Sequence, residues 1–252
     1  MTDEPILELR HVEKSFGPVH VLNDVAFSAR SGEVTALVGD NGAGKSTLVK
    51  CISGTYTMDS GEYLFEGRPV TVHTPHDSAA LGIEIVYQDL ALCDNLDIVQ
   101  NMFLGRERRR LGLLDEGTME TAARKTLAEL KVTTVRSIRQ PVGSLSGGQR
   151  QAVAVARAVL EDAKLVIMDE PTAALGVSQT AMVLNLVRTL SESGVAVLLI
   201  SHNLVDVFSV ADNIAVLYLG NIVTVAPTAE LDTQRAVELI TTGAMANGKG
   251  GR

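Results

Sequence analysis

Residues 39–47, GDNGAGKST, combine three glycines, one lysine and two hydroxyl side chains between an apolar run and a helix-forming stretch. Gly39, Gly42 and Gly44 admit backbone conformations closed to other residues, so successive N–H groups can turn inward around an anion. A helix beginning near Lys45 adds its positive end, and Lys45 adds a full charge. The segment predicts a loop that binds the phosphates of a nucleoside triphosphate.

The spacing Gly-x4-Gly-Lys-Ser is that of the phosphate-binding loop, in which the hydroxyl of Ser46 binds Mg²⁺. A strand before the loop and a helix after it are the context that this motif requires. Kinases, GTPases, helicases and transporters share the loop, so the loop leaves the reaction open. The residues of the loop predicted to bind nucleotide are Gly39, Asp40, Asn41, Gly42, Ala43, Gly44, Lys45, Ser46 and Thr47.

Length and charge limit the class of protein. The 252 residues fit one large α/β domain or one core with an inserted subdomain. A net charge of −8 argues against nucleic acid as the main partner, because phosphate backbones require a positive surface. No apolar stretch approaches the ~20 residues of a membrane helix. The acidic start of the chain does not resemble a signal peptide, and we expect a cytoplasmic protein.

Apolar runs and turn signals predict an alternation of strands and helices, which implies a parallel sheet covered by helices. Residues 90–143 differ, because they show helical periodicity and no strand signal, and we expect an inserted helical subdomain there. The glycine-rich residues 243–252 predict a flexible tail. Strands are predicted at residues 6–12, 21–29, 33–38, 61–65, 83–87, 165–168 and 195–200, and helices at 77–82, 98–104, 119–130 and 149–160.

Two acids follow the apolar strand at residues 165–168. The carboxyl end of a strand is where ligands bind in parallel sheets. Asp169 is therefore expected to reach Mg²⁺, directly or through water. Glu170 points differently and suits a carboxylate that polarises the attacking water.

The segment LSGGQ at residues 145–149 (the LSGGQ segment) predicts a second anion site. Ser146 is placed as the N-cap of the following helix, and the two glycines expose its first N–H groups. If the two anion sites lie on opposite flanks of the sheet, one chain cannot close both on one phosphate. We therefore expect a dimer in which the LSGGQ segment of each copy caps the nucleotide held by the other. The residues predicted to bind nucleotide in trans are Ser146, Gly147, Gly148 and Gln149.

The basic run at residues 106–110 contains four arginines. An isolated charge run is usually a solvated loop, and that is the expectation here. Contact with lipid head groups or with a membrane partner is the alternative.

These motifs, in this order, resemble those of ABC transporter ATPases over nearly the whole chain. The resemblance implies a phosphate-loop fold with a mostly parallel sheet core (about residues 1–89 and 144–242), an N-terminal antiparallel β subdomain and a helical subdomain (about 90–143). It also implies ATP and Mg²⁺ as cofactors. Phe16 matches the aromatic residue that stacks on adenine, Gln88 the glutamine that touches Mg²⁺ and the attacking water, and His202 the histidine that positions Glu170 and water.

The segments FGPVHVLNDV (16–25), GDNGAGKSTLVKCISG (39–54), VYQDLALCDNLDIVQNMFLG (86–105) and DEPTAALGVSQT (169–180) resemble monosaccharide importers of the ribose, xylose and fructose type. Such an ATPase would lie on the inner face of the cell membrane, pair with a second copy or a paralogue, dock on permease subunits, and serve an extracytoplasmic sugar-binding protein. A soluble ABC ATPase acting on nucleic acid or ribosomes, or an importer of another solute, remains the alternative.

One position departs from the family pattern. Gly176 stands where many ABC ATPases carry Asp, so it has no side chain to bond across a dimer interface. We expect either a positive φ at Gly176 that aims the next helix, capped by Ser178, or a flexible turn.

Overall fold

The computed structural model describes residues 4–243. Its central sheet has six strands in the order β12-β11-β3-β10-β9-β6, and all neighbours are parallel except β11 and β12. Buried on both faces, the inner strands are almost entirely apolar, as parallel sheets require. The six strands are β3 (Val34–Val38), β6 (Ile83–Val86), β9 (Leu165–Asp169), β10 (Ala196–Ile200), β11 (Asn213–Tyr218) and β12 (Asn221–Pro227).

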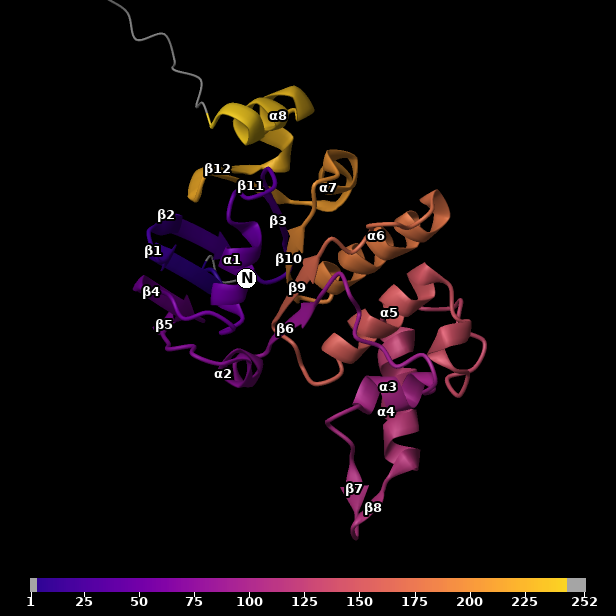
Figure 1. Ribbon diagram of the computed structural model, residues 1–252. Coiled ribbons are helices and arrows are strands. Elements are labelled where there is room, and N and C mark those ends of the chain that lie inside the picture. Colours follow the sequence, from indigo (N-terminus) through magenta and orange to yellow (C-terminus); the bar gives the residue numbers. More distant parts are fainter. Residues whose placement is uncertain (1–3, 244–252) are drawn as a thin grey trace, which may run out of the picture.

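A second, antiparallel sheet lies beside the first, with the order β2-β1-β4-β5 (Figure 1). Side chains alternate along β3, so Leu37 packs toward this second sheet while Ala36 and Val38 pack toward the helices on the other face. Helix α1 (Lys45–Ile52) buries its apolar side chains in the cluster between the two sheets. The strands are β1 (Leu7–Phe16), β2 (Val19–Ala29), β4 (Ser60–Phe65) and β5 (Arg68–Pro69).

Helices α3 (Ile98–Phe103) and α4 (Glu116–Glu129) pack against α5 (Gly147–Ala158), and together they extend to one side of the sheet (Figure 1). The buried Asn101 fixes the loop that leads into this group. Its side-chain oxygen accepts a hydrogen bond from the Cys93 amide at 2.8 Å, and its nitrogen donates to the carbonyls of Cys93 and Leu96. The boundaries of the helical subdomain, at residues 90 and 143, stay a prediction.

The remaining helices flank the sheet or follow its strands. Helix α6 (Val177–Glu192) lies on the face that also receives α5, and α8 (Thr233–Thr242) packs against β11. Gly243 ends α8 in the left-handed conformation, with φ 64°. The other helices are α2 (Pro75–Ala80) and α7 (Leu204–Val210), with short 3₁₀ turns at Val142–Ser144 and Thr228–Glu230.

The structure corrects the expectation that residues 90–143 contain no strand. The basic run enters a two-stranded hairpin, β7 (Arg109–Arg110) and β8 (Leu113–Leu114), where a solvated loop was expected. Two residues per strand are too few for a periodicity signal. Strands β11 and β12 were also not predicted. The expected flexible tail lies outside the described residues except for Gly243, and among residues 4–243 no helix is long and apolar enough to cross a membrane.

Candidate functional site

The loop between β3 and α1 holds its shape through its glycines. Gly42 and Gly44 have φ of 83° and 110°, conformations that L side chains rarely adopt. A side chain at Gly39 would collide with the carbonyl oxygen of Leu217 on the neighbouring strand. Gly44 is the N-cap of α1 and has no side chain to occupy the first amides of the helix. Those amides are therefore available to an anion.

Lys45 is directed back over this loop. Its Nζ donates to the carbonyl oxygens of Gly39 at 2.6 Å and of Asp40 at 3.0 Å. Burial lowers the pKa of Lys45, while the carboxylates of Glu170, Asp40 and Asp169 oppose that shift. The ammonium is thus held at the loop by fixed partners and faces the strand-end acids.

The carboxyl ends of β6, β9 and β10 reach the same edge of the sheet as this loop. A cavity of about 460 Å³ opens there. It joins the phosphate-binding loop to Gln88, Asp169, Glu170 and His202, four of the residues that the sequence predicted from other strands. The lining residues are Val21, Asn41, Gly42, Gly44, Lys45, Ser46, Thr47, Gln88, Asp169, Glu170, Ile200 and His202.

Glu170 and His202 form a pair across this edge. The Nδ1 of His202 lies 2.8 Å from the Oε2 of Glu170, whose side chain is 16% exposed while that of the histidine is 72% exposed. The backbone N–H of Glu170 donates to the carbonyl of Ile200 at 2.9 Å. Glu170 has φ 50°, a left-handed conformation that is disfavoured for a residue with a side chain. Its carboxylate is therefore held in one direction by backbone and by histidine.

Asp169 precedes this pair on the same strand. Burial raises its pKa, and the neighbouring Glu170 raises it further, while Lys45 acts against both. Asp169 shares the cavity wall with Ser46 and Gln88. A carboxylate, a hydroxyl and an amide oxygen are hard oxygen donors of the kind that Mg²⁺ takes beside nucleotide phosphates. The donor set fits Mg²⁺.

Phe16 lies outside the lining of this cavity. The Phe16 ring is 43% exposed and packs edge-on against Tyr56, with ring centroids 5.2 Å apart. Sequence reasoning missed Tyr56, because an isolated aromatic residue after a helix gives no pattern. It also missed Val21 and Ile200, whose place in the cavity wall depends on how the strands meet.

The LSGGQ segment also lies outside the cavity, at the start of α5. Ser146 is the N-cap of α5, as predicted, and its Oγ accepts from the amide of Gln149 at 3.4 Å. The Gln149 side chain accepts from the Ser146 amide at 2.9 Å and donates to the Thr134 carbonyl at 2.7 Å. Both polar atoms of Gln149 thus serve the helix start and the segment before it.

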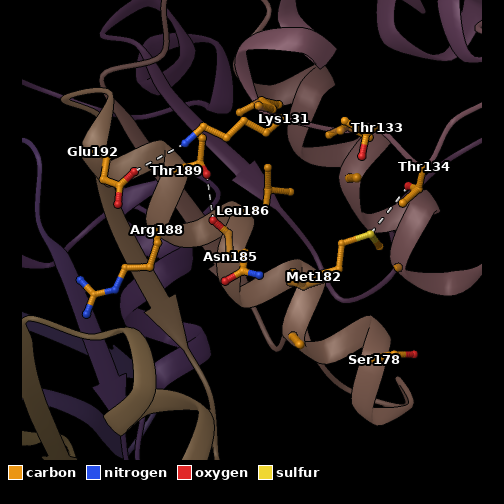
Figure 2. Close-up of a pocket in the computed structure, with 16 residues that line it drawn as sticks. Lys131, Thr133, Thr134, Ser178, Met182, Asn185, Leu186, Arg188, Thr189 and Glu192 are labelled. Carbon is orange, nitrogen blue, oxygen red and sulfur yellow. Dashed lines mark hydrogen bonds and ion pairs between the residues drawn. The ribbon is translucent and has the colours of Figure 1, made fainter.

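A second cavity, of about 570 Å³, lies behind the LSGGQ segment, between α6 and residues 130–134 (Figure 2). Thr134 Oγ1 lies 3.8 Å from the sulfur of Met182, and Lys131 faces Glu192 at 3.9 Å. A Cβ on Gly148 would lie 2.5 Å from the terminal methyl of Met182. Gly148 thus allows α5 to pack on α6 without displacing the end of the Met182 side chain or the neighbouring Gln179, whose Cβ would lie at 3.1 Å.

The structure corrects the expectation for Gly176. Its φ is −74°, and it is itself the N-cap of α6, without a side-chain hydrogen bond. Ser178 lies in the first turn of α6 and does not cap it. Between Glu170 and this helix, the left-handed residue is Ala174, with φ 60°. The left-handed turn before α6 is therefore made at Ala174, two residues before the position predicted.

A glycine loop on a helix N-terminus, a lysine above it, and two acids at the end of a neighbouring parallel strand define a phosphate-loop nucleoside triphosphatase. The sequence matches the model of the ABC transporter family over residues 22–173. The chain belongs to the ABC transporter family, whose ATPases hydrolyse ATP to drive transport.

Curated relatives cover nearly all of the chain. It is 46% identical to the fructose import ATP-binding protein FrcA of Rhizobium meliloti, over 96% of this chain and 95% of that protein. It is 46% identical to the xylose/arabinose import ATP-binding protein XylG of Sulfolobus acidocaldarius, over 95% of each. It is 40% identical to the ribose import ATP-binding protein RbsA of Chromobacterium violaceum, over 92% of this chain and 46% of that one.

Solved structures share the fold. A crystal structure of the ADP conformation of an ATP-binding cassette of an ABC transporter superimposes with a TM-score of 0.81 at 27% identity, covering 95% of this chain and 96% of that one. A nucleotide-free ATP-binding cassette from an ABC transporter gives a TM-score of 0.77 at 28% identity, covering 89% and 92%.

The packing of Gly148 yields a first prediction. Alanine inside a helix is normally more stable than glycine by about 1 kcal/mol. Gly148→Ala should gain less than this in free energy of unfolding, because the added methyl must displace the end of the Met182 side chain. In a Met182→Ala background the same change should gain more. Gly117→Ala, at the same position of α4, is the matched control, since a Cβ there meets one atom within 4 Å, at 3.9 Å. An equal effect of Gly148→Ala in both backgrounds, measured by denaturant unfolding, would contradict the contact.

Asp169 yields a second prediction. Asp169→Asn should raise the Tm of the nucleotide-free chain by about 2 °C, because it removes a carboxylate whose ionised form burial disfavours. Because the pKa of Asp169 is raised in the folded state, its ionised carboxylate destabilises the fold at pH values above the ordinary pKa of aspartate. The gain should therefore disappear as pH falls toward about 4.

Calorimetry with and without ATP and Mg²⁺ checks this prediction. The Asp169→Asn variant should also lose most of the extra stabilisation that Mg²⁺ adds to ATP, since a ligand stabilises only the state that binds it. Glu230→Gln, at an exposed acid, is the control and should change neither value. A lower Tm in the Asp169→Asn variant would show that the carboxylate stabilises the fold.

Proposed function

We propose that this ATPase powers the import of a monosaccharide through a membrane permease. The observation that carries the proposal is the cavity at the carboxyl edge of the sheet, which gathers Lys45, Asp169, Glu170 and His202. The named activities of the relatives, fructose, xylose/arabinose and ribose import, support a sugar as the transported solute.

Each residue of the site has a part in this proposal. Lys45 and the loop amides bind the β- and γ-phosphates of ATP. Ser46, Gln88 and Asp169 would hold Mg²⁺, which neutralises charge on the phosphates. Glu170 orients the attacking water and accepts its proton, and His202 holds the Glu170 carboxylate in position at 2.8 Å. Phe16 stacks on the adenine from the end of β1.

The LSGGQ segment completes the site from a second copy of the chain. Ser146, Gly147 and Gly148 would present the first turn of α5 to the γ-phosphate held by the other copy. Gln149 acts differently, because its side chain is already bonded to Ser146 and Thr134. We assign Gln149 to holding the shape of the segment that meets the nucleotide.

The permease docks beside Gln88. A small cleft of about 180 Å³ lies between the central sheet and α5, lined in part by Tyr87, Leu90 and Arg157. The Tyr87 side chain is 45% exposed and stands next to Gln88, which lines the nucleotide cavity. A permease segment seated there would sense the nucleotide through Gln88. The chain would lie on the inner face of the membrane, and an extracytoplasmic sugar-binding protein would deliver the solute.

Replacing Glu170 tests the chemistry. Glu170→Gln should bind ATP and Mg²⁺ but hydrolyse ATP at least about a hundredfold more slowly, the usual scale for loss of a general base. Closed dimers should then accumulate, which size-exclusion chromatography with ATP and Mg²⁺ detects as a doubled mass. Glu192→Gln, at an exposed end of α6, should turn over normally. A monomeric Glu170→Gln variant with normal turnover would assign the chemistry to another group.

Uptake by cells that express the chain with its transporter tests the transport proposal. Lys45→Ala should abolish uptake of one among radiolabelled fructose, xylose, arabinose and ribose, because the phosphates of ATP lose their fixed positive partner. Lys125→Ala, on the exposed face of α4, should leave uptake unchanged. If no labelled monosaccharide depends on Lys45, the chain energises the transport of a different solute.

A further inference from the structure

The β7–β8 hairpin projects from the far end of the helical group, beyond α4 and away from the central sheet (Figure 1). Arg109 pairs with Leu114 and Arg110 with Leu113, and the two strands are joined by Leu111 and Gly112. Both turn residues have positive φ, 53° and 83°, which defines a tight turn of the type I′ kind. The hairpin contributes no residue to the nucleotide cavity.

Leu111 is an unfavourable residue type for its position in the turn. The first central position of such a turn favours Asn, Asp or Gly, because other side chains are strained at positive φ. Leu111 is nevertheless there, and its side chain is 98% exposed, so no packing contact compensates for the strain. A residue that violates a local rule without a packing gain marks a functional position.

Its neighbours extend the apolar surface and add charge. Leu113 and Leu114 are 75% and 54% exposed. Residues paired across two strands project to the same face, so each face of the hairpin presents one arginine and one leucine. Residues 105–115 contain four arginines and two acids, a local charge of +2 on a chain of net charge −8. The hairpin is therefore apolar at its tip and basic along both of its faces.

We infer that this hairpin inserts tip-first into the head-group layer of an anionic lipid bilayer. Leucines at the tip would enter the boundary between head groups and acyl chains, while arginine side chains reach outward to the lipid phosphates. A negative surface repels a chain of net charge −8 but attracts this basic hairpin, so charge also orients the molecule.

A lipid surface fits this geometry better than a protein partner. All six residues of the hairpin are exposed, although Arg110 also lines a groove along α4. A protein partner would need a socket around the tip, whereas a bilayer admits an inserted tip without shape complementarity. Arg106, at the base of the hairpin, also lines the small cleft beside Tyr87 and donates to Glu84 at 3.2 Å. The hairpin therefore lies on the side where the permease is proposed to dock. The position of the permease rests on the proposed function, whereas lipid binding by the hairpin does not.

The absence of tryptophan from the sequence provides the experiment. Leu113→Trp in the full chain introduces a single tryptophan beside the tip. Its fluorescence should shift to the blue with vesicles of phosphatidylglycerol and phosphatidylcholine, and much less with phosphatidylcholine alone or at high salt. Val225→Trp, on β12 and 47% exposed, is the matched control and should not shift.

Second substitutions in the Leu113→Trp chain separate the apolar contribution of the tip from the electrostatic contribution of the arginines. Leu111→Asn should weaken vesicle binding by at least about tenfold while leaving Tm equal or higher, because asparagine suits the turn. Arg109→Gln should weaken binding by about fivefold. Both should keep normal ATPase activity, and Lys45→Ala should keep normal vesicle binding, so a failure of the hairpin proposal is distinct from a failure of the proposed function.

Two results would overturn the inference. One is the lack of a blue shift with anionic vesicles, or an equal shift in the Val225→Trp control. The other is a shift that occurs only in vesicles containing the permease, independent of lipid charge, which would make the hairpin a contact with protein.

Discussion

The parallel register of the central strands is the constraint on which the site depends. Ile200 on β10 lies level with Leu37 on β3 and with Asp169 on β9, and Met168 lies level with Val86 on β6. Segments from four distant parts of the chain therefore end at one edge of the sheet. The nucleotide cavity is formed at that edge, because Gln88, Glu170 and His202 each come one or two residues after the end of a strand.

The grouping of charged residues at this edge lowers the stability of the folded chain. Glu170 keeps a left-handed backbone, burial raises the pKa of Asp169, and burial lowers the pKa of Lys45. Like charges at Asp169 and Glu170 stand side by side, with Lys45 as their shared counter-charge. Such strain is tolerated at sites that bind a ligand, because the ligand later supplies the missing interactions. Here a nucleotide and Mg²⁺ would supply opposite charge to both the lysine and the acids.

The LSGGQ segment and α5 are connected to the carboxyl edge of the sheet through α6. The LSGGQ segment is held by the capping box of Ser146 and Gln149, and Gly148 fits against Met182 of α6. Helix α6 begins at Val177, a few residues after Glu170. A shift at the strand-end acids would therefore move the LSGGQ segment, which is proposed to meet a second copy. The hairpin beyond α4 lies outside this chain of contacts, which agrees with a role toward the membrane surface rather than toward the nucleotide.

The sequence by itself determined strands β3, β6, β9 and β10 of the central sheet, the phosphate-binding loop, the two acids and the N-cap at Ser146, because each depends on local chemistry. Backbone freedom at Gly42 and Gly44, the apolar strand before Asp169 and the capping box at Ser146 leave a pattern within a few residues. Gln88, His202 and Phe16 came from the family resemblance. Only the tertiary structure decided the rest. Val21 and Ile200 line the cavity because distant strands meet there, Gln149 finds Thr134 across a loop, and Gly176 takes an ordinary φ because the turn is made at Ala174. The β7–β8 hairpin escaped prediction because two-residue strands have no period, and its shape is set by the turn at Leu111, a residue type that sequence rules do not place there.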